Sequence, residues 1–453
     1  MNELERLSEY IVELKLEDIP IDVIETTKLC ILDSFSAAVG ASKDQMVVDI
    51  INEDKSFYEN GNDVDVWGID IKLPLVQAAF LNALMGHRLE LDDVHTNSKT
   101  HIGTIVVPTA LSICQYLKLS GKDLLKAVIC GYEIMSRIGM ALGVSSHRNK
   151  GWHVTSTAGT FGAAAAASKL LKLNKEQTLN ALGMAGTQSF GLWAFLEDSA
   201  SSKILHPARA ASSGIEAVML AKAGMTGPKS ILDAKDGGLL EAMSDEYDIS
   251  KVIKDLGRVY EIQNVDNKPY PCCRSTHCTI ESRIYLRNQY NIDVDNIHEI
   301  EVETYLVGYK QCGVTEGSLN PKTPTEAKFS TPYTVAIALL NGNVILEDFK
   351  EERIRDEKVK ALVKKIKVKP NDIFTARYPE HWGCKTTITM LDGQKLVVEI
   401  KDALGSVYNP LSKEQIAIKA TPLLKVSYAD KTIDLIETMM NIEGLEDLSK
   451  LKL

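Results

Sequence analysis

The sequence predicts a mainly α-helical protein that also carries a smaller α+β domain. Across residues 1–262, apolar side chains recur at helical spacing and are interrupted by Gly, Pro and polar capping residues. In residues 297–305 apolar and polar side chains alternate, and in residues 386–400 two such runs flank an Asp-Gly turn. Both patterns are typical of β-strands. Helical spacing returns after residue 409.

The spacing also predicts the individual elements. In the first part we expect helices that contain Leu4 and Val23, followed by helices at residues 73–87, 107–118, 122–142, 156–171, 175–190, 207–224 and 228–243. The middle part should hold helices at residues 276–290, 325–340 and 355–366 beside its strands. We expect residues 406–453 to pack back on a helical domain formed by residues 1–262. Residues 263–405 then form the smaller α+β domain.

The composition limits the class of protein. The chain has 453 residues, of which 45% are hydrophobic and 25% charged, as in globular proteins with a sizeable core. Its net charge of −10 provides no basic field for a phosphate backbone, so nucleic acid is not an expected partner. No apolar run reaches the roughly 18 residues that span a bilayer, so no membrane is expected either. The acidic N-terminus does not resemble a secretory signal, so we expect a cytoplasmic protein with reduced cysteines.

The usual short catalytic motifs are absent from the sequence, and the histidines carry the remaining signal. There is no GxGxxG, GxxxxGK[ST], HExxH, GxSxG or CxxC pattern. Four of the nine histidines, namely His101, His153, His206 and His277, lie at or near predicted helix starts. The candidate capping residues there are Thr155, Ser156 and Ser275, and Pro207 is a favoured first helical residue.

Helix starts give these histidines a possible catalytic use. Free backbone N–H groups and the positive end of the helix dipole favour anions and lower the proton affinity of a nearby imidazole. A neutral imidazole can act as a general base near pH 7. Lys203 and Arg274 add a cation to two of the helix starts. If the four starts converge, they form a positive pocket for a small polycarboxylate. The alternative is that each histidine only caps or packs, and that the two cations are solvated.

Two other clusters invite a functional interpretation. Glu90, Asp92 and Asp93 follow a predicted helix, and they could orient a histidine, hold a substrate hydroxyl or bind a hard cation. They could equally form a solvated acidic loop. The run from Cys272 to Cys278 contains three cysteines and a histidine, but no second Cys/His pair with zinc spacing accompanies it. We therefore expect no metal site.

Five segments in chain order resemble the MmgE/PrpD family. They are LELDDVHTNSKTHIGTIVVPTAL (89–111), GWHVTSTAGTFGAAAAASKLLKL (151–173), SSKILHPARAASSGIEAVMLAKAGMTGP (201–228), PYPCCRSTH (269–277) and EAKFSTPYTVAIALLNG (326–342). The family includes 2-methylcitrate dehydratase, cis-aconitate decarboxylase and iminodisuccinate epimerase. The resemblance covers most of the chain and is more specific for the family than for the substrate.

The resemblance implies a fold and a site. It implies a large all-helical domain made from both chain ends, an inserted α+β lid domain, a homodimer, and an active site in the cleft between the domains. It implies no metal or organic cofactor. Matched by motif, the catalytic residues are His101, His153, Lys203 and His277, and Asp93, His206, Arg274 and Glu90 would help to bind the substrate. The sequence departs from the family pattern at Glu90, where Asp is common, at Val94, where Thr is common, and at Ile102, where Pro is common.

From the family and the residues together we expect a cofactor-independent hydro-lyase that acts on a polycarboxylate such as 2-methylcitrate. His153 or His277 would remove the proton next to a carboxylate, Lys203 and Arg274 would hold carboxylates, and His101 would protonate the departing hydroxyl. The acid and base assignments could be exchanged. Alternatives are an epimerase of an iminodisuccinate-type dicarboxylate, a decarboxylase of cis-aconitate, and a binding protein without turnover.

Overall fold

The computed structural model describes residues 1–53, 63–198, 200–290 and 292–453, and these divide into two compact units. Unit 1 contains Met1–Phe195, Ser202–Asn267 and Ser412–Leu453, and unit 2 contains Leu196–Ser201 and Lys268–Leu411. Most of the described residues are helical, so the prediction of a mainly α protein is confirmed. The predicted boundaries of an inserted lid stay a prediction.

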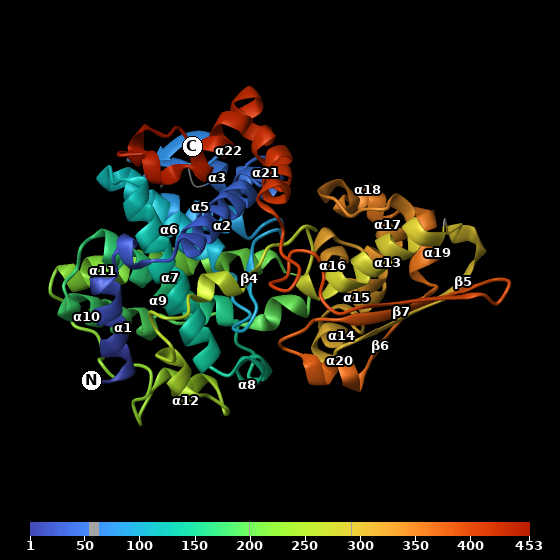
Figure 1. Cartoon of the computed structure of the whole chain (residues 1–453), viewed down its shortest axis with the longest axis horizontal. Helices are drawn as coiled ribbons and strands as arrows, with labels where there is room; N and C mark the ends of the chain where they lie inside the picture. The colour runs from blue at the N-terminus through green and yellow to red at the C-terminus, as the bar shows by residue number, and fades with distance from the viewer. Residues whose placement is uncertain (54–62, 199, 291) are drawn as a thin grey trace. The chain divides into compact units, whose positions relative to one another are not determined.

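Unit 1 is a stack of α-helices with two short antiparallel strand pairs (Figure 1). Its α-helices are α1 (Glu3–Glu13), α2 (Ile21–Gly40), α3 (Gln45–Glu53), α5 (Leu75–Gly86), α6 (Gly103–Leu117), α7 (Gly121–Ala141), α8 (Val144–Asn149), α9 (Val154–Leu170), α10 (Lys175–Thr187), α11 (Leu205–Lys222), α12 (Leu239–Met243), α21 (Lys413–Tyr428) and α22 (Thr432–Met440). Strand β1 (Val64–Val66) pairs with β2 (Ile69–Leu73), and β3 (Val94–His95) pairs with β4 (Val265–Asp266). Helix α21 packs against α2, so the end of the chain belongs to the same unit as its start.

Helix α9 lies at the centre of unit 1. Every residue from 154 to 168 is buried, and α6, α7, α10 and α11 all pack against it. A helix that is buried all round has no polar face, which explains its run of alanines and glycines. The small side chains let the neighbouring backbones come close. A Cβ atom added to Gly214 of α11 would lie 2.3 Å from Ala163 Cβ and 2.7 Å from the backbone nitrogen of Ala164.

Unit 2 is built on a four-stranded sheet with strand order β6-β5-β7-β8. The strands are β5 (Ile297–Thr304), β6 (Ile366–Pro370), β7 (Cys384–Met390) and β8 (Lys395–Ile400). β5 runs parallel to β6 and antiparallel to β7, and Ile300 pairs with Ile366 on one side and with Ile388 on the other. Helix α13 (His277–Tyr290) packs against β7, β8 and α17 (Thr331–Asn341). The shorter helices are α14 (Leu306–Cys312), α15 (Glu316–Leu319), α16 (Pro324–Lys328), α18 (Glu351–Ile354), α19 (Glu357–Val363) and α20 (Asp372–Arg377).

Three predicted helices differ from the structure. Of residues 228–243 only 239–243 are α-helical, because Gly237, at φ 78°, takes a left-handed turn that a helix does not allow. The predicted helix at 325–340 is two helices, since Ser330 caps a new start by accepting a hydrogen bond from the backbone N–H of Tyr333. The Lys-rich helix ends at Val363, and the strand β6 that follows it was missed.

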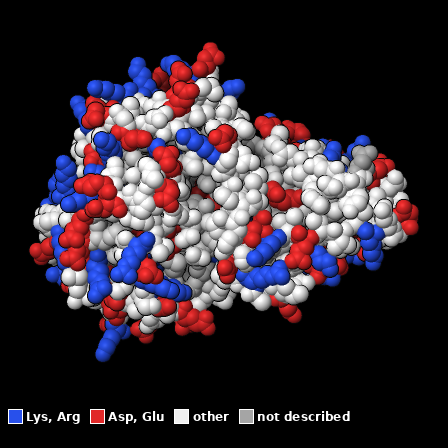
Figure 2. Space-filling view, in the orientation of Figure 1, with Lys and Arg blue, Asp and Glu red and all other residues white. Residues whose placement is uncertain are grey.

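The distribution of surface charge and the character of the helices are those of the globular protein that the composition predicts. Figure 2 shows Lys and Arg interspersed with Asp and Glu over the face that is drawn. Within the described residues, no helix combines the length and the apolar character that crossing a bilayer requires.

The close approach of α9 and α11 yields a prediction. Gly214→Ala should lower the free energy of unfolding by about 1–3 kcal/mol, because the new methyl group meets backbone atoms of α9 that cannot rotate away. Urea unfolding of the purified protein measures the change. Gly444→Ala is the matched control, since an added Cβ there meets nothing within 4 Å. Equal midpoints for the two variants would contradict the packing described here.

Candidate active site

The four predicted histidines do lie at helix starts. His153 is the N-cap residue of α9, His206 is the second residue of α11, and His277 is the first residue of α13. His101 lies two residues before α6. The expected side-chain caps are not formed, however, because α9 has no side-chain cap and Ser275 lies inside the 3₁₀ turn Arg274–Thr276.

Unit 1 brings most of the predicted site residues together in its interior. The Nδ1 atoms of His153 and His206 lie 2.7 Å apart, so one ring donates a hydrogen bond and the other accepts it. The ring of His87, which sequence reasoning did not select, lies 4.8 Å from the ring of His101 and 6.3 Å from that of His153, centroid to centroid. The side chain of Lys203 is buried beside these rings and bonded to Glu90.

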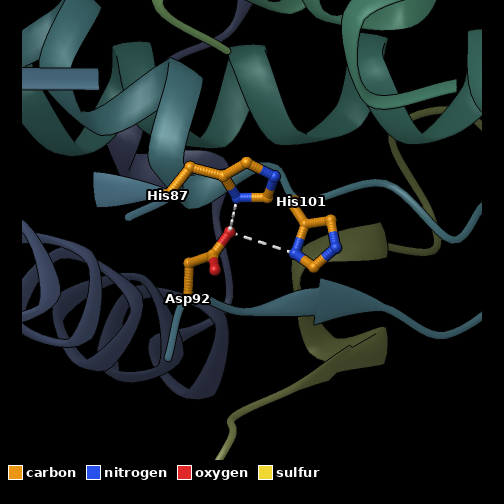
Figure 3. A group of neighbouring side chains, drawn as sticks. All are labelled: His87, Asp92 and His101. Carbon is orange, nitrogen blue, oxygen red and sulfur yellow. Dashed lines mark hydrogen bonds and ion pairs between the residues drawn. The ribbon is translucent and has the colours of Figure 1, made fainter. Parts of the chain in front are cut away.

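Asp92 joins two of the imidazoles. Its Oδ2 atom lies 2.6 Å from Nδ1 of His87 and 3.0 Å from Nδ1 of His101 (Figure 3). Nδ1 of His101 is also 2.8 Å from the backbone carbonyl oxygen of Asp93. A carbonyl oxygen only accepts hydrogen bonds, so Nδ1 of His101 carries a proton. In the neutral ring Nε2 is then the unprotonated nitrogen.

The three acidic residues are buried, so the alternative of a solvated acidic loop is wrong. Asp92 is 0% exposed and Glu90 is 6% exposed. The carboxylate of Asp93 accepts hydrogen bonds from the Tyr132 hydroxyl at 2.6 Å and from the backbone N–H of Gly103 at 2.9 Å. It therefore holds the start of α6 against α7. Burial raises the pKa of Asp93 to about 7.

Glu90 combines a buried charge with an unusual backbone. Its carboxylate forms an ion pair with Lys203, and its φ of 59° lies in the left-handed region. That region costs a residue with a Cβ atom about 1–3 kcal/mol, and such residues cluster at functional sites. Lys203 reaches this pair from the 3₁₀ turn Ser201–Ile204, directly before α11. The turn and the loop after α5 thus meet through one pair of opposite charges.

Three imidazoles of this cluster, those of His87, His153 and His206, are neutral at pH 7. Burial lowers the pKa of His87 to about 4, although the carboxylate of Asp92 opposes this shift. Burial and the charge of Lys203 also bring the pKa of His206 to about 4. The pKa of His153 lies well below its usual value because the ring is buried and because His206 and Lys203 are close. Beside these three neutral rings, Lys203 carries the positive charge, and Glu90 is its partner.

Aromatic rings line the histidine pair. The ring of Trp193 lies 5.0 Å from that of His153, and the ring of Phe195 lies 6.0 Å from His153 and 5.8 Å from His206. Phe190 approaches His206 at 6.2 Å. The pair therefore has an apolar border, although its own contacts are polar.

His87, Asp92 and His101 are also the residues that could hold a metal ion, since one ligand atom from each lies within 4.8 Å of the others. Asp92 Oδ2 and His87 Nδ1 are at hydrogen-bond distance, 2.6 Å, so these two atoms bond to each other here. The proton on His101 Nδ1 blocks that nitrogen as a ligand and leaves Nε2 as the ring atom that could bind a metal ion.

Arg274 and His277 belong to unit 2, and His277 has local partners there. Both are buried, and Nε2 of His277 donates a hydrogen bond of 3.3 Å to the carbonyl oxygen of Cys272. The ring of Tyr270 packs edge-on against His277 at 5.2 Å. Their roles stay a prediction. Sequence reasoning also passed over Lys268, which is 1% exposed and lies just before the PYPCCRSTH segment.

Comparison with known proteins gives the family. Residues 5–251 match the MmgE/PrpD N-terminal domain, and residues 270–442 match the MmgE/PrpD C-terminal domain. The two matches cover most of the chain. This protein belongs to the MmgE/PrpD family, as the five sequence segments indicated.

Enzymes of two activities are among the relatives. The chain is 26% identical to cis-aconitate decarboxylase of Aspergillus terreus, over 97% of this chain and 92% of that protein. It is 28% identical to cis-aconitate decarboxylase of Homo sapiens, over 97% and 91% of the two chains. It is 25% identical to 2-methylcitrate dehydratase of Escherichia coli, over 83% and 80%. The relatives are thus enzymes named for small carboxylate substrates.

The buried carboxyl group of Asp93 yields a prediction about pH. Its pKa is about 7 in the folded protein and ~4 in the unfolded chain, so between these values the unfolded state binds fewer protons. Ionisation of Asp93 therefore lowers stability as the pH rises. Asp93→Asn removes this loss, so the variant should gain about 1 kcal/mol per pH unit relative to the wild type between pH 5 and 7.

Urea unfolding of both proteins at pH 5, 6 and 7 measures this difference. The lost hydrogen bonds change the free energy of unfolding of the variant by the same amount at every pH. Only the pH dependence of the difference between the two proteins therefore reports on the ionisation of Asp93. A difference that stays constant with pH would show that Asp93 is ionised throughout.

Proposed function

We propose that this protein is a lyase that removes CO₂ from cis-aconitate or a closely similar unsaturated tricarboxylate. The observation that carries the proposal is the cluster in unit 1. There a buried ammonium group, Lys203, lies beside imidazoles that Lys203 and burial keep neutral. Lys203 is paired with Glu90, so a substrate carboxylate would share this ammonium group or replace Glu90, and the neutral rings would serve as hydrogen-bond partners. The relatives named as cis-aconitate decarboxylases, which align over 97% of this chain, support the choice of substrate.

The chemistry needs a cation, a proton donor and a dry region. As the C–C bond breaks, CO₂ leaves and its electron pair remains on the carbon skeleton next to a carboxylate, where it takes up one proton. Lys203 would hold a carboxylate and stabilise the charge that develops there. His101 or His153 would deliver the proton, once the substrate's negative charge has raised the proton affinity of the ring. The geometry leaves the choice between these two rings open.

The aromatic border favours loss of CO₂. A carboxylate placed against Trp193 and Phe195 is poorly solvated, whereas neutral CO₂ does not need solvation. The apolar surface beside His153 therefore destabilises the charged group that disappears in the reaction.

Dehydration of a hydroxy-tricarboxylate such as 2-methylcitrate is the second candidate. The relatives named as 2-methylcitrate dehydratases support it. A neutral imidazole in this cluster could remove the proton next to a carboxylate, and a second one could protonate the departing hydroxyl. Mass spectrometry separates the two reactions, because one product has lost CO₂ and the other has lost water. Inversion with deuterium uptake and no loss of mass would indicate an epimerase.

We also propose that Arg274 and His277 bind or protonate the same substrate, because the PYPCCRSTH motif carries them. Replacement of either residue should then reduce turnover in the assay described next. Normal turnover in both variants would remove them from the proposal.

The ammonium group of Lys203 gives the first functional prediction. Lys203→Met should reduce kcat/KM for cis-aconitate by at least 100-fold, because the variant loses the cation that holds a carboxylate in the transition state. Lys169→Met is the matched control: this lysine is also partly buried in unit 1, but it donates to the carbonyl oxygen of Val12. The control should retain activity. The proposal is wrong if both variants turn over the substrate like the wild type.

The low pKa values of the imidazoles give the second functional prediction. A bound tricarboxylate adds negative charge beside His153 and His206 and raises their pKa values, so binding should be accompanied by proton uptake that is larger at pH 6 than at pH 7. Calorimetry with the unreactive analogue propane-1,2,3-tricarboxylate, in two buffers of different ionisation enthalpy, measures the uptake.

A second buried histidine provides the control for proton uptake. His147→Gln should leave the uptake unchanged, because His147 bonds to Met243 and Thr157 and not to residues of the cluster. His206→Gln should reduce it. Binding without proton uptake in the wild type would contradict the electrostatic account of the site.

A further inference from the structure

His87 is a polar residue with an unexpected place in unit 1. It follows the last residue of α5, where its backbone caps the helix end, and its side chain is 0% exposed. Its Nδ1 atom lies 2.6 Å from Asp92 Oδ2, and within the described part of the chain its buried Nε2 atom has no hydrogen-bond partner. Burial of an imidazole with one unsatisfied nitrogen is unfavourable. A position that served packing alone would be better filled by an apolar residue.

The contacts of Asp92 show which residue His87 acts on. The Oδ2 atom of Asp92 lies close to both His87 and His101 (Figure 3). The carboxylate therefore stays close to His101 only while it keeps the orientation in which it bonds to His87. His87 is neutral at pH 7, so Nδ1 must carry the proton if it is to bond to a carboxylate. The donor of His87 therefore fixes the position of the carboxylate that faces His101.

We propose that His87 is a positioning residue, which through Asp92 holds the ring of His101 with its proton on Nδ1 and its Nε2 directed to the substrate. This inference rests on the proposed function and assigns the transfer of the proton to His101 and not to His153. His87 itself does not touch the reacting atoms. It acts on the orientation and tautomer of His101, in the way that a carboxylate orients the catalytic histidine in many hydrolases.

The chain of contacts is short and buried. The link from His87 to Asp92 spans five residues and closes the loop after α5. The link from Asp92 to His101 is supported by the carbonyl oxygen of Asp93, which accepts from the same Nδ1. The carboxylate and the carbonyl that face Nδ1 of His101 thus belong to two consecutive residues. If His87 is lost, Oδ2 of Asp92 loses the donor that holds it at 2.6 Å, whereas the carbonyl oxygen of Asp93 keeps its place.

Three variants of His87 test the proposal. An asparagine places its amide N–H close to the position of histidine Nδ1, whereas the longer glutamine places it near Nε2. His87→Leu should lower kcat for cis-aconitate by at least tenfold with less than a threefold change in KM, because the ammonium group of Lys203 remains. His87→Asn should recover kcat to within threefold of the wild type, and His87→Gln should not.

The matched control is again a buried histidine. His147→Asn removes an imidazole that is as buried as that of His87 but does not contact Asp92. It should retain the kcat of the wild type. If His87→Leu loses stability, the comparison of the Asn and Gln variants still decides, because both keep a polar side chain at this position. Equal kcat values for these two variants, or an unaltered kcat in His87→Leu, would overturn the proposal.

An independent measurement does not require turnover. In protein labelled with ¹⁵N-histidine, NMR should show His101 protonated on Nδ1 in the wild type and in His87→Asn, and a mixture of tautomers in His87→Leu. If cis-aconitate is not a substrate but the tautomers behave in this way, the proposed function fails and the positioning by His87 stands. An unchanged tautomer in His87→Leu would refute the positioning. So would one equivalent of tightly bound metal, because metal ligation would replace these hydrogen bonds.

Discussion

The structure of the site depends on a carboxylate that is completely buried between two imidazoles. A lone buried carboxylate is very unfavourable, and it becomes acceptable only when several donors face it. Asp92 has a donor in His87 and lies 3.0 Å from Nδ1 of His101, and the neighbouring Asp93 has donors in Tyr132 and Gly103. Because these groups come from separate positions in the chain, the two aspartates tie the loop after α5 to α6 and α7.

Helix α9 sets the other side of the same site. Its small residues allow α7 and α11 to approach closely, and this approach brings the start of α11 next to the start of α9. His153 and His206 meet there although 53 residues separate them. The packing of the helical core therefore determines the distance between these two rings. A methyl group added between α9 and α11 would push the helices apart and change that distance.

The sequence was a good guide to local structure and a weaker guide to contacts between distant residues. Local signals such as Pro207 placed three of the four histidines at helix starts correctly, and the fourth just before one. They could not reveal that His153 bonds to His206, since that contact depends on how two helices pack. His87 was missed because it follows a helix end, whereas the sequence argument selected histidines at helix starts. Residues 228–243 were predicted as a helix on apolar spacing, but the Gly237-Gly238 pair decided the local conformation.

The pairing of Lys203 with Glu90 bears on the proposed reaction. The ammonium group already has a carboxylate partner, so a substrate carboxylate must take the place of Glu90 or share the cation with it. A buried carboxylate that loses its cation becomes unstable as an anion and favours protonation. Loss of CO₂ from a tricarboxylate consumes one proton, whereas dehydration consumes none overall. In the proposed reaction, the proton taken up as the anionic substrate binds is the one that loss of CO₂ consumes.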